Sequence, residues 1–190
     1  MALRVFIAVD IDDPMLVSRL ERLIDSLRAT GVPMKPVEPE NLHITLRFIG
    51  EVPEGLVEEI KREVIGRLEF DPFDLELRGL GAFPGPYRPR VVWVGVSEGS
   101  EGLRRLHDLV EEGLRRLGVP PERGAKEYVP HLTLARIKGS RNLQALTKLI
   151  LEHGDYLVGR MRVTSVRLKK STLTRRGPIY ETLAEARARG

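Results

Sequence analysis

One short pattern occurs twice in this chain: a histidine, an apolar residue, a threonine and a leucine. The first copy carries His43 and Thr45, and the second carries His131 and Thr133. On a β-strand, alternate side chains lie on the same face. Each copy would therefore present a His–Thr pair on one face of a sheet and bury its apolar residues on the other.

Two imidazoles and two hydroxyls facing one another suit the cleavage of a phosphodiester. This reaction needs a base to activate the attacking oxygen and an acid to protonate the leaving oxygen, and a histidine with a pKa of ~6.5 can do either. Hydroxyls can donate to the non-bridging oxygens. A single His-x-Thr strand is usually structural, so the doubling carries the inference. We predict that His43 and His131 are catalytic and that Thr45 and Thr133 bind the phosphate.

Three residues just behind the motifs are further candidates for binding the substrate. Arg47 would share the face of His43 by regular alternation. Arg136 would not share the face of His131 on a regular strand, and needs a bulge or a strand end to turn inward. Phe48 offers an aromatic ring for a base. The other two histidines, His107 and His153, lie in predicted helices, and we expect no catalytic role for them.

The apolar periodicity predicts a plan that is repeated along the chain. Strands are expected at 3–11, 43–50, 73–83, 90–96, 128–137, 160–172 and 179–187, and helices at 14–30, 53–68, 101–118 and 141–152, the last capped by Ser140. Each motif strand follows a strand, a helix and a loop, and precedes a helix. This order favours an α+β fold of two similar lobes with largely antiparallel sheets, in one domain over residues 1–190. A doubly wound parallel sheet is the alternative, but no glycine-rich strand-to-helix turn supports it.

The composition restricts the function further. The chain has no cysteine, which excludes a disulfide framework, a thiolate metal site and a cysteine nucleophile, and fits a reducing cytoplasm. The amino terminus is unlike a signal peptide, and no apolar run approaches the ~20 residues of a membrane span. We therefore expect a cytoplasmic protein without a membrane segment. The net charge of +4 and the pI of about 9.6 favour polyanionic partners, and the scarcity of Asn and Gln is typical of thermophiles.

The paired segments HITL and HLTL resemble the two signature motifs of the 2H phosphoesterase superfamily. The flanking segments RVFIAVD, VEPENLHITLRFIGEV, RVVWVGV, YVPHLTLARI and GPIYETL extend the resemblance, nearly from end to end, to the RNA 2′,3′-cyclic phosphodiesterases, also called 2′-5′ RNA ligases. The resemblance implies two pseudo-symmetric lobes with outer helices and a central active-site cleft. It also implies hydrolysis of a terminal 2′,3′-cyclic phosphate to a 2′-phosphate, with no metal or other cofactor. By resemblance, His43 is the acid and His131 the base.

The expected partner is RNA with a 2′,3′-cyclic phosphate end, or a small cyclic nucleotide, and the expected state is a monomer. Three other interpretations remain open. Asp10 and Asp12 could hold metal ions in a metal-dependent phosphodiesterase. ATP-dependent ligation lacks the phosphate loop G-x-x-x-x-G-K-[ST], so ligation would have to be reversal of the phosphodiester chemistry. A non-catalytic RNA-binding module could use Phe48, Tyr87 and Trp93 for stacking, but leaves the doubled motif unexplained.

Overall fold

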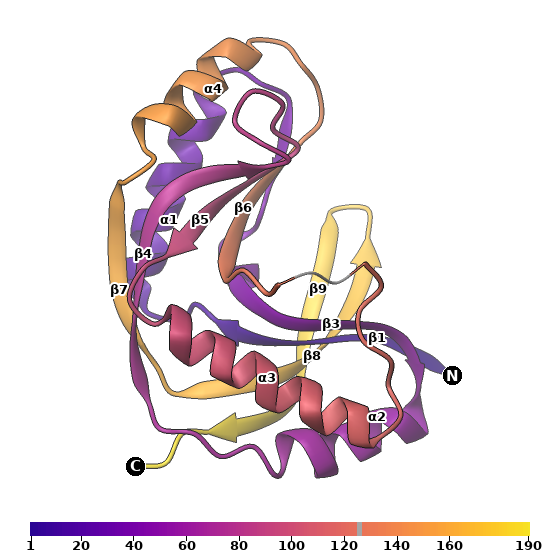
Figure 1. Ribbon diagram of the computed structural model, residues 1–190. Coiled ribbons are helices and arrows are strands. Elements are labelled where there is room, and N and C mark those ends of the chain that lie inside the picture. Colours follow the sequence, from indigo (N-terminus) through magenta and orange to yellow (C-terminus); the bar gives the residue numbers. More distant parts are fainter. Residues whose placement is uncertain (125–126) are drawn as a thin grey trace.

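The computed structural model of the protein describes residues 1–124 and 127–190 (Figure 1). In this part of the chain, nine strands form one strongly curved sheet, and every pairing in it is antiparallel. The strands are β1 (Ala2–Asp10), β2 (Met34–Pro36), β3 (His43–Pro53), β4 (Phe73–Phe83), β5 (Val91–Val96), β6 (His131–Ile137), β7 (Leu157–Val163), β8 (Ser165–Thr174) and β9 (Gly177–Arg187). Their spatial order is β7-β4-β5-β6-β3-β1-β8-β9, and β2 pairs with β6.

Four α-helices lie on the outer side of the curved sheet (Figure 1). They are α1 (Pro14–Arg28), α2 (Glu54–Ile60), α3 (Ser100–Arg116) and α4 (Leu143–Glu152). Helix α1 packs against β6 and β7, whereas α3 packs against β3. Each of these two helices therefore crosses over: it follows a strand of one half of the sheet and covers the other half. This crossing joins the two halves through a shared apolar core.

The two halves of the sheet correspond strand by strand when each is counted from its outer edge to the centre. The series β7-β4-β5-β6 on one side matches β9-β8-β1-β3 on the other, and the two motif strands meet at the centre. There β3 and β6 share one register pair, Ile44 with Leu132. The local two-fold axis therefore passes between these two residues, and the prediction of an α+β fold with two pseudo-symmetric, largely antiparallel halves is confirmed. The extent of the domain, residues 1–190, stays a prediction.

Some element boundaries differ from the sequence prediction. The strand expected at 160–172 is two strands, because β7 ends at Val163 and pairs with β4, whereas β8 starts at Ser165 and pairs with β1. Thr164 lies between them, and nothing local marks it as a break. The segment between the helix expected at 14–30 and the strand expected at 43–50 contains β2. The second helix changes from α2 to a π-helical turn over Lys61–Ile65.

Helix α4 begins later than expected, because Asn142, with a φ of 59°, is its N-cap in place of Ser140. None of the helices in the described part of the chain is long and apolar enough to cross a membrane.

Candidate active site

His43 is the first residue of β3, and both of its ring nitrogens are engaged. Its Nδ1 lies 2.7 Å from the carbonyl oxygen of Asn41, and its Nε2 lies 3.0 Å from the hydroxyl of Thr45. A carbonyl oxygen can only accept a hydrogen bond, so Nδ1 is protonated and donates a hydrogen bond to the carbonyl oxygen of Asn41. In the neutral ring, Nε2 is then the basic atom and accepts a hydrogen bond from Thr45.

His131 is the first residue of β6 and is held in the same way. Its Nδ1 lies 2.8 Å from the carbonyl oxygen of Val129, again two residues before the histidine. By the same argument, the neutral ring keeps its lone pair on Nε2. Both motif histidines therefore have the same tautomer. In each, Nδ1 is bonded to the backbone and Nε2 keeps the lone pair of the neutral ring.

The four motif side chains lie on one face of the sheet, which we call the motif face. In an antiparallel pair, residues directly opposite each other share a face. Extending the register of Ile44 and Leu132 by one residue sets His43 opposite Thr133 and Thr45 opposite His131. The two imidazoles are close enough to interact, since the charge of His131 is among the causes that lower the pKa of His43.

A β-bulge in β3 overturns the prediction for Arg47. Thr45 pairs with Ala8 and Arg47 pairs with Ile7, so Leu46 is an extra residue and the alternation of the strand is reversed after it. Arg47 therefore lies on the opposite face from His43. There it is buried, with 4% of its side chain exposed, and its Nε donates to Glu111 at 2.5 Å. The prediction that Arg47 shares the face of the first motif is wrong.

The same bulge turns Phe48 toward the motif face. Phe48 pairs with Phe6, which also packs against the ring of His43 at a centroid distance of 5.1 Å. The guanidinium of Arg4 lies 4.9 Å from the centre of the Phe48 ring, a cation–π arrangement. Phe48 is partly exposed and is therefore accessible to a ligand.

A second β-bulge, at the equivalent place in β6, turns an arginine toward the motif face, whereas the first bulge turns Arg47 away from it. Thr133 pairs with Trp93 and Ala135 pairs with Val92, so Leu134 is the extra residue. Arg136 consequently lies on the motif face, and the bulge that the sequence analysis required for this orientation is present. Burial raises the pKa of Tyr180, and the charge of Arg136 is close enough to oppose this shift. Each motif strand thus has its bulge directly after the threonine, and Phe48 and Arg136 occupy equivalent positions.

The burial of His43 favours its neutral form. Burial lowers the pKa of His43 below its ordinary value of 6.5; the hydrogen bond to Asn41 and the charge of Asp10 oppose this shift, and Lys169 reinforces it. Asp10 lies opposite His43 in the register of β1 and β3.

The carboxylate of Asp10 is occupied by two cations. One of its oxygens accepts hydrogen bonds from Arg167 and from Lys169, each at 2.8 Å. Asp12 lies beyond the end of β1. Among the residues that the structure describes, no group of His, Asp and Glu side chains is arranged to hold a metal ion.

Aromatic side chains flank both histidines, and the sequence analysis did not predict most of them. Tyr180 on β9 meets the edge of His43 at a centroid distance of 5.5 Å, and Phe83 meets His131 at 5.0 Å. Trp93 lies 6.3 Å from His131, and its indole N–H is buried without a hydrogen-bond partner in the described part of the chain. Tyr180 belongs to the segment GPIYETL, which carries part of the resemblance, but the sequence analysis did not predict it as a site residue.

The remaining two histidines lie in α3 and at the end of α4. His107 on α3 stacks on Tyr128 with ring centroids 4.4 Å apart, and the hydroxyl of Tyr128 donates to the carbonyl of Thr45 at 2.8 Å. His153 lies at the end of α4 and bonds through Nδ1 to the carbonyl of Leu149 at 2.9 Å. His107 therefore supports the first motif strand from behind through Tyr128.

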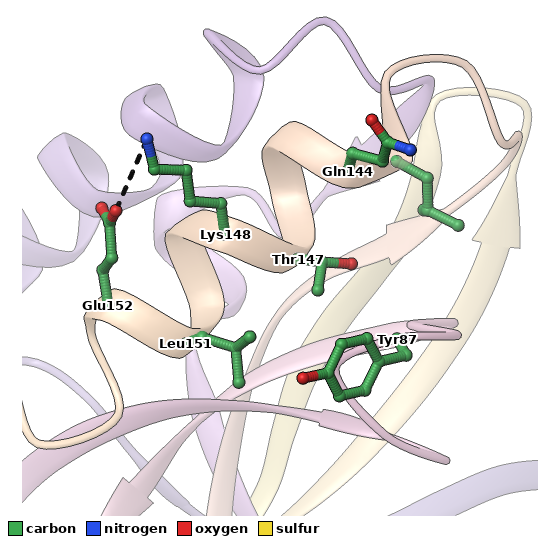
Figure 2. A pocket seen from close by; sticks show the side chains of 7 residues that line it. Tyr87, Gln144, Thr147, Lys148, Leu151 and Glu152 are labelled. Carbon is green, nitrogen blue, oxygen red and sulfur yellow. Dashed lines mark ion pairs between the residues drawn. The ribbon is translucent and has the colours of Figure 1, made fainter.

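A pocket of about 410 Å³ lies away from the motifs, between α4 and the β4–β5 loop (Figure 2). Its walls include Tyr87, Leu151 and the ion pair of Lys148 with Glu152, and none of the four motif residues lines it. Tyr87 was a candidate for stacking on a base together with Phe48 and Trp93. The structure does not bring it to the motif face beside them.

Comparison with known proteins identifies the family of this chain. The sequence model of the 2′-5′ RNA ligase superfamily matches residues 16–173. The chain is 59% identical over 173 residues to the RNA 2′,3′-cyclic phosphodiesterase of Aeropyrum pernix, covering 91% of this chain and 97% of that one. It is 44% identical to the protein of the same name from Methanothermobacter thermautotrophicus, over 95% of this chain and 96% of the other. The chain belongs to the 2′-5′ RNA ligase superfamily, as the paired motifs predicted.

Solved structures share the fold over the whole chain. The protein TT0787 of Thermus thermophilus superposes with a TM-score of 0.81 at 29% identity, covering 99% of both chains. LigT of E. coli, solved in complex with 3′-AMP, has a TM-score of 0.76 at 23% identity, covers 100% of this chain and 99% of its own, and is similar in fold.

Proposed function

We propose that this protein hydrolyses the 2′,3′-cyclic phosphate at the end of an RNA to a 2′-phosphate. The observation that carries the proposal is the matched orientation of His43 and His131. Each ring is anchored through Nδ1 to a backbone carbonyl, at 2.7 and 2.8 Å, and each keeps Nε2 for chemistry. The names of the Aeropyrum and Methanothermobacter relatives support the same activity.

The proposed reaction needs one neutral and one protonated histidine. Water attacks the phosphorus while a neutral Nε2 takes its proton, and the other Nε2–H gives its proton to the 3′ oxygen as that oxygen leaves. The phosphate stays on the 2′ oxygen. Thr45 and Thr133 donate hydrogen bonds to the non-bridging oxygens, whose negative charge must be stabilised in the transition state. Arg136 adds positive charge from the same face, and Phe48 offers a surface to a base.

Two opposing arguments bear on which histidine is the acid. The family resemblance assigns His43 as the acid and His131 as the base. Burial lowers the pKa of His43, however, and favours its neutral form, which suits the base in the free protein. A substrate with an activated leaving group needs no acid, so it should rescue the His→Ala variant of whichever residue is the acid. Rescue of His43→Ala supports the resemblance, and rescue of His131→Ala supports the assignment from burial.

The decisive experiment is turnover of an RNA oligonucleotide that ends in a 2′,3′-cyclic phosphate, with excess chelator present. We expect a 2′-phosphate product, identified by phosphorus NMR, at a rate that the chelator does not change. Loss of activity in chelator would instead support metal catalysis, and binding without turnover would support an RNA-binding module. A 3′-phosphate product would contradict the assigned leaving group.

Small cyclic nucleotides and ligation follow from the same chemistry. The reaction acts on the terminal ring, so a 2′,3′-cyclic mononucleotide is expected to be a substrate as well. Ligation would follow if a 5′-hydroxyl attacked the cyclic phosphate in place of water. The 3′ oxygen would leave as before, and the product would be a 2′-5′ phosphodiester formed with no ATP. The cytoplasmic location and the monomeric state stay predictions.

A further inference from the structure

The hairpin of β8 and β9 bends over the motif face and reaches the other half of the sheet. The side-chain amide of Asn41 donates to the carbonyl of Pro178 at 3.0 Å, which ties the hairpin to the residues just before the first motif. At its tip, the side chain of Lys35 on β2 lies 3.5 Å from the position that a Cβ on Gly177 would take. Figure 1 shows the hairpin standing across from β6.

Four cations come together where the hairpin tip meets β2 and β6. Arg175 and Arg176 form the turn, and Lys35 pairs in register with Arg136, so these two share a face. Within residues 1–124 and 127–190, none of the four makes an ion pair with a carboxylate. We call these four residues the basic tip. Their uncompensated charge creates a positive potential at one end of the motif face.

An exposed apolar side chain lies beside the basic tip, near the end of β8. Leu173 is 68% exposed and pairs in register with Pro178. By alternation with Lys169 and Ser171, the side chain of Leu173 lies on the inner side of the hairpin. A surface that combines exposed apolar groups with unpaired arginines fits a single-stranded nucleic acid, which presents both phosphates and base faces.

The basic tip is too far from the histidines for all of it to contact the reacting phosphate. Arg136 follows His131 by five residues, which corresponds to roughly 16 Å along a strand at ~3.3 Å per residue. Arg175 and Arg176 lie in the hairpin turn, five and four residues before Tyr180, which is the hairpin residue that contacts His43. We propose that Arg175 and Arg176 bind backbone phosphates of the RNA upstream of its cyclic end, so that the hairpin selects RNA chains over mononucleotides. The proposal rests on the proposed function for the identity of the ligand.

The test compares R175Q/R176Q with R22Q/R28Q, a control that removes two exposed arginines from α1 on the outer side of the sheet. One readout is kcat/KM for an RNA of about ten nucleotides with a cyclic end and for 2′,3′-cyclic AMP. We expect the hairpin variant to lose roughly tenfold on RNA and to keep its activity on cyclic AMP, whereas the control keeps both. The slope of log kcat/KM on log salt should become shallower by about 1.4, at ~0.7 per phosphate contact on a single strand.

Binding gives a second readout that does not depend on catalysis. Fluorescence anisotropy with a labelled RNA that ends in a 2′-phosphate should show a roughly tenfold weaker Kd for R175Q/R176Q and no change for the control. Unchanged RNA affinity in the hairpin variant, or equal losses in both variants, would overturn the proposal. A wild-type protein that binds the RNA but does not turn it over would contradict the proposed function and leave the hairpin result to be judged from binding alone.

Discussion

The two motif strands share one backbone plan but differ in what surrounds their histidines. His43 is enclosed by Phe6 and Tyr180, bonded to Thr45 and set opposite Asp10, whereas His131 lies against Phe83 and opposite Gly95. The backbone carbonyls that anchor the two rings are equivalent.

This difference shows how a near-symmetric fold can support an asymmetric reaction. The two-fold symmetry of the sheet explains why two similar imidazoles are present. The residues at equivalent positions around them, such as Asp10 and Gly95 or Phe48 and Arg136, break that symmetry. An in-line displacement needs one acid and one base, so this asymmetry matches what the proposed chemistry requires.

The largest expected effect comes from removing either histidine. His43→Ala and His131→Ala should each lower kcat on an RNA with a cyclic end by about 10²–10⁴, the usual contribution of a general acid or base. His107→Ala and His153→Ala are the matched controls and should stay within severalfold. Near-normal turnover by a folded His131→Ala variant would show that the second motif is not part of the catalytic pair.

The threonines should follow with a smaller loss. Thr45→Val and Thr133→Val keep the size of the side chain and remove one donor to the phosphate, which typically costs about 10² in kcat. The Thr45 variant should also change the titration of His43, because the hydroxyl of Thr45 is bonded to Nε2 of this histidine. NMR of the imidazoles measures this change, and identical titration curves in wild type and Thr45→Val would refute it.

Arg136 and Phe48 test what the two equivalent bulges do. Arg136→Gln should raise KM for the cyclic phosphate by roughly tenfold, because it removes a charge from the motif face. Phe48→Leu should change KM only severalfold, and more for RNA than for a mononucleotide, since stacking acts on a base. Steady-state kinetics on both substrates separate the two effects. Equal losses for the two variants would contradict different roles for these positions.

Asp10 should matter more for stability than for rate. Asp10→Asn removes the carboxylate that pairs with Lys169 and Arg167, and Lys169 has no other ion pair in the described part of the chain. Because Lys169 is only 9% exposed, we expect a loss of about 3 kcal/mol in the free energy of unfolding. Asp74→Asn breaks the exposed pair with Arg162 and is the control, with an expected loss below about 1 kcal/mol. Urea denaturation measures both, and equal losses would argue against a structural role for Asp10.

The smallest expected effect is a dependence of stability on pH. The pKa of His43 is lower in the folded protein than in the unfolded chain, so its contribution to stability is complete above about pH 6.5 and is lost as the pH falls toward the folded value. The free energy of unfolding should therefore fall more steeply on acidification in wild type than in His43→Gln. Urea denaturation at several pH values measures the slopes, and parallel slopes would contradict a buried neutral His43.

The sequence was sufficient to predict the motif faces and the repeated plan, because alternation and periodicity are local properties. It could not reveal the bulges after Thr45 and Thr133, since each depends on the register with a neighbouring strand. For this reason the orientation of Arg47 was predicted wrongly. The break at Thr164 was missed for the same reason, because its cause is pairing with two different strands, β4 and β1, in opposite halves of the sheet.

The aromatic surroundings of the histidines were beyond local reasoning too. Tyr180 reaches His43 only because the β8–β9 hairpin bends over the sheet. Such curvature arises from the packing of the whole sheet, and no short segment of the sequence encodes it.

The most direct test of the central claim is a crystal structure of the protein with a 2′-phosphorylated nucleotide, the expected product. We predict that the phosphate lies between His43 and His131, with each Nε2 within hydrogen-bonding distance of a phosphate oxygen and with the hydroxyls of Thr45 and Thr133 donating to the others. A phosphate bound by only one of the two motifs, or bound away from both, would contradict the account.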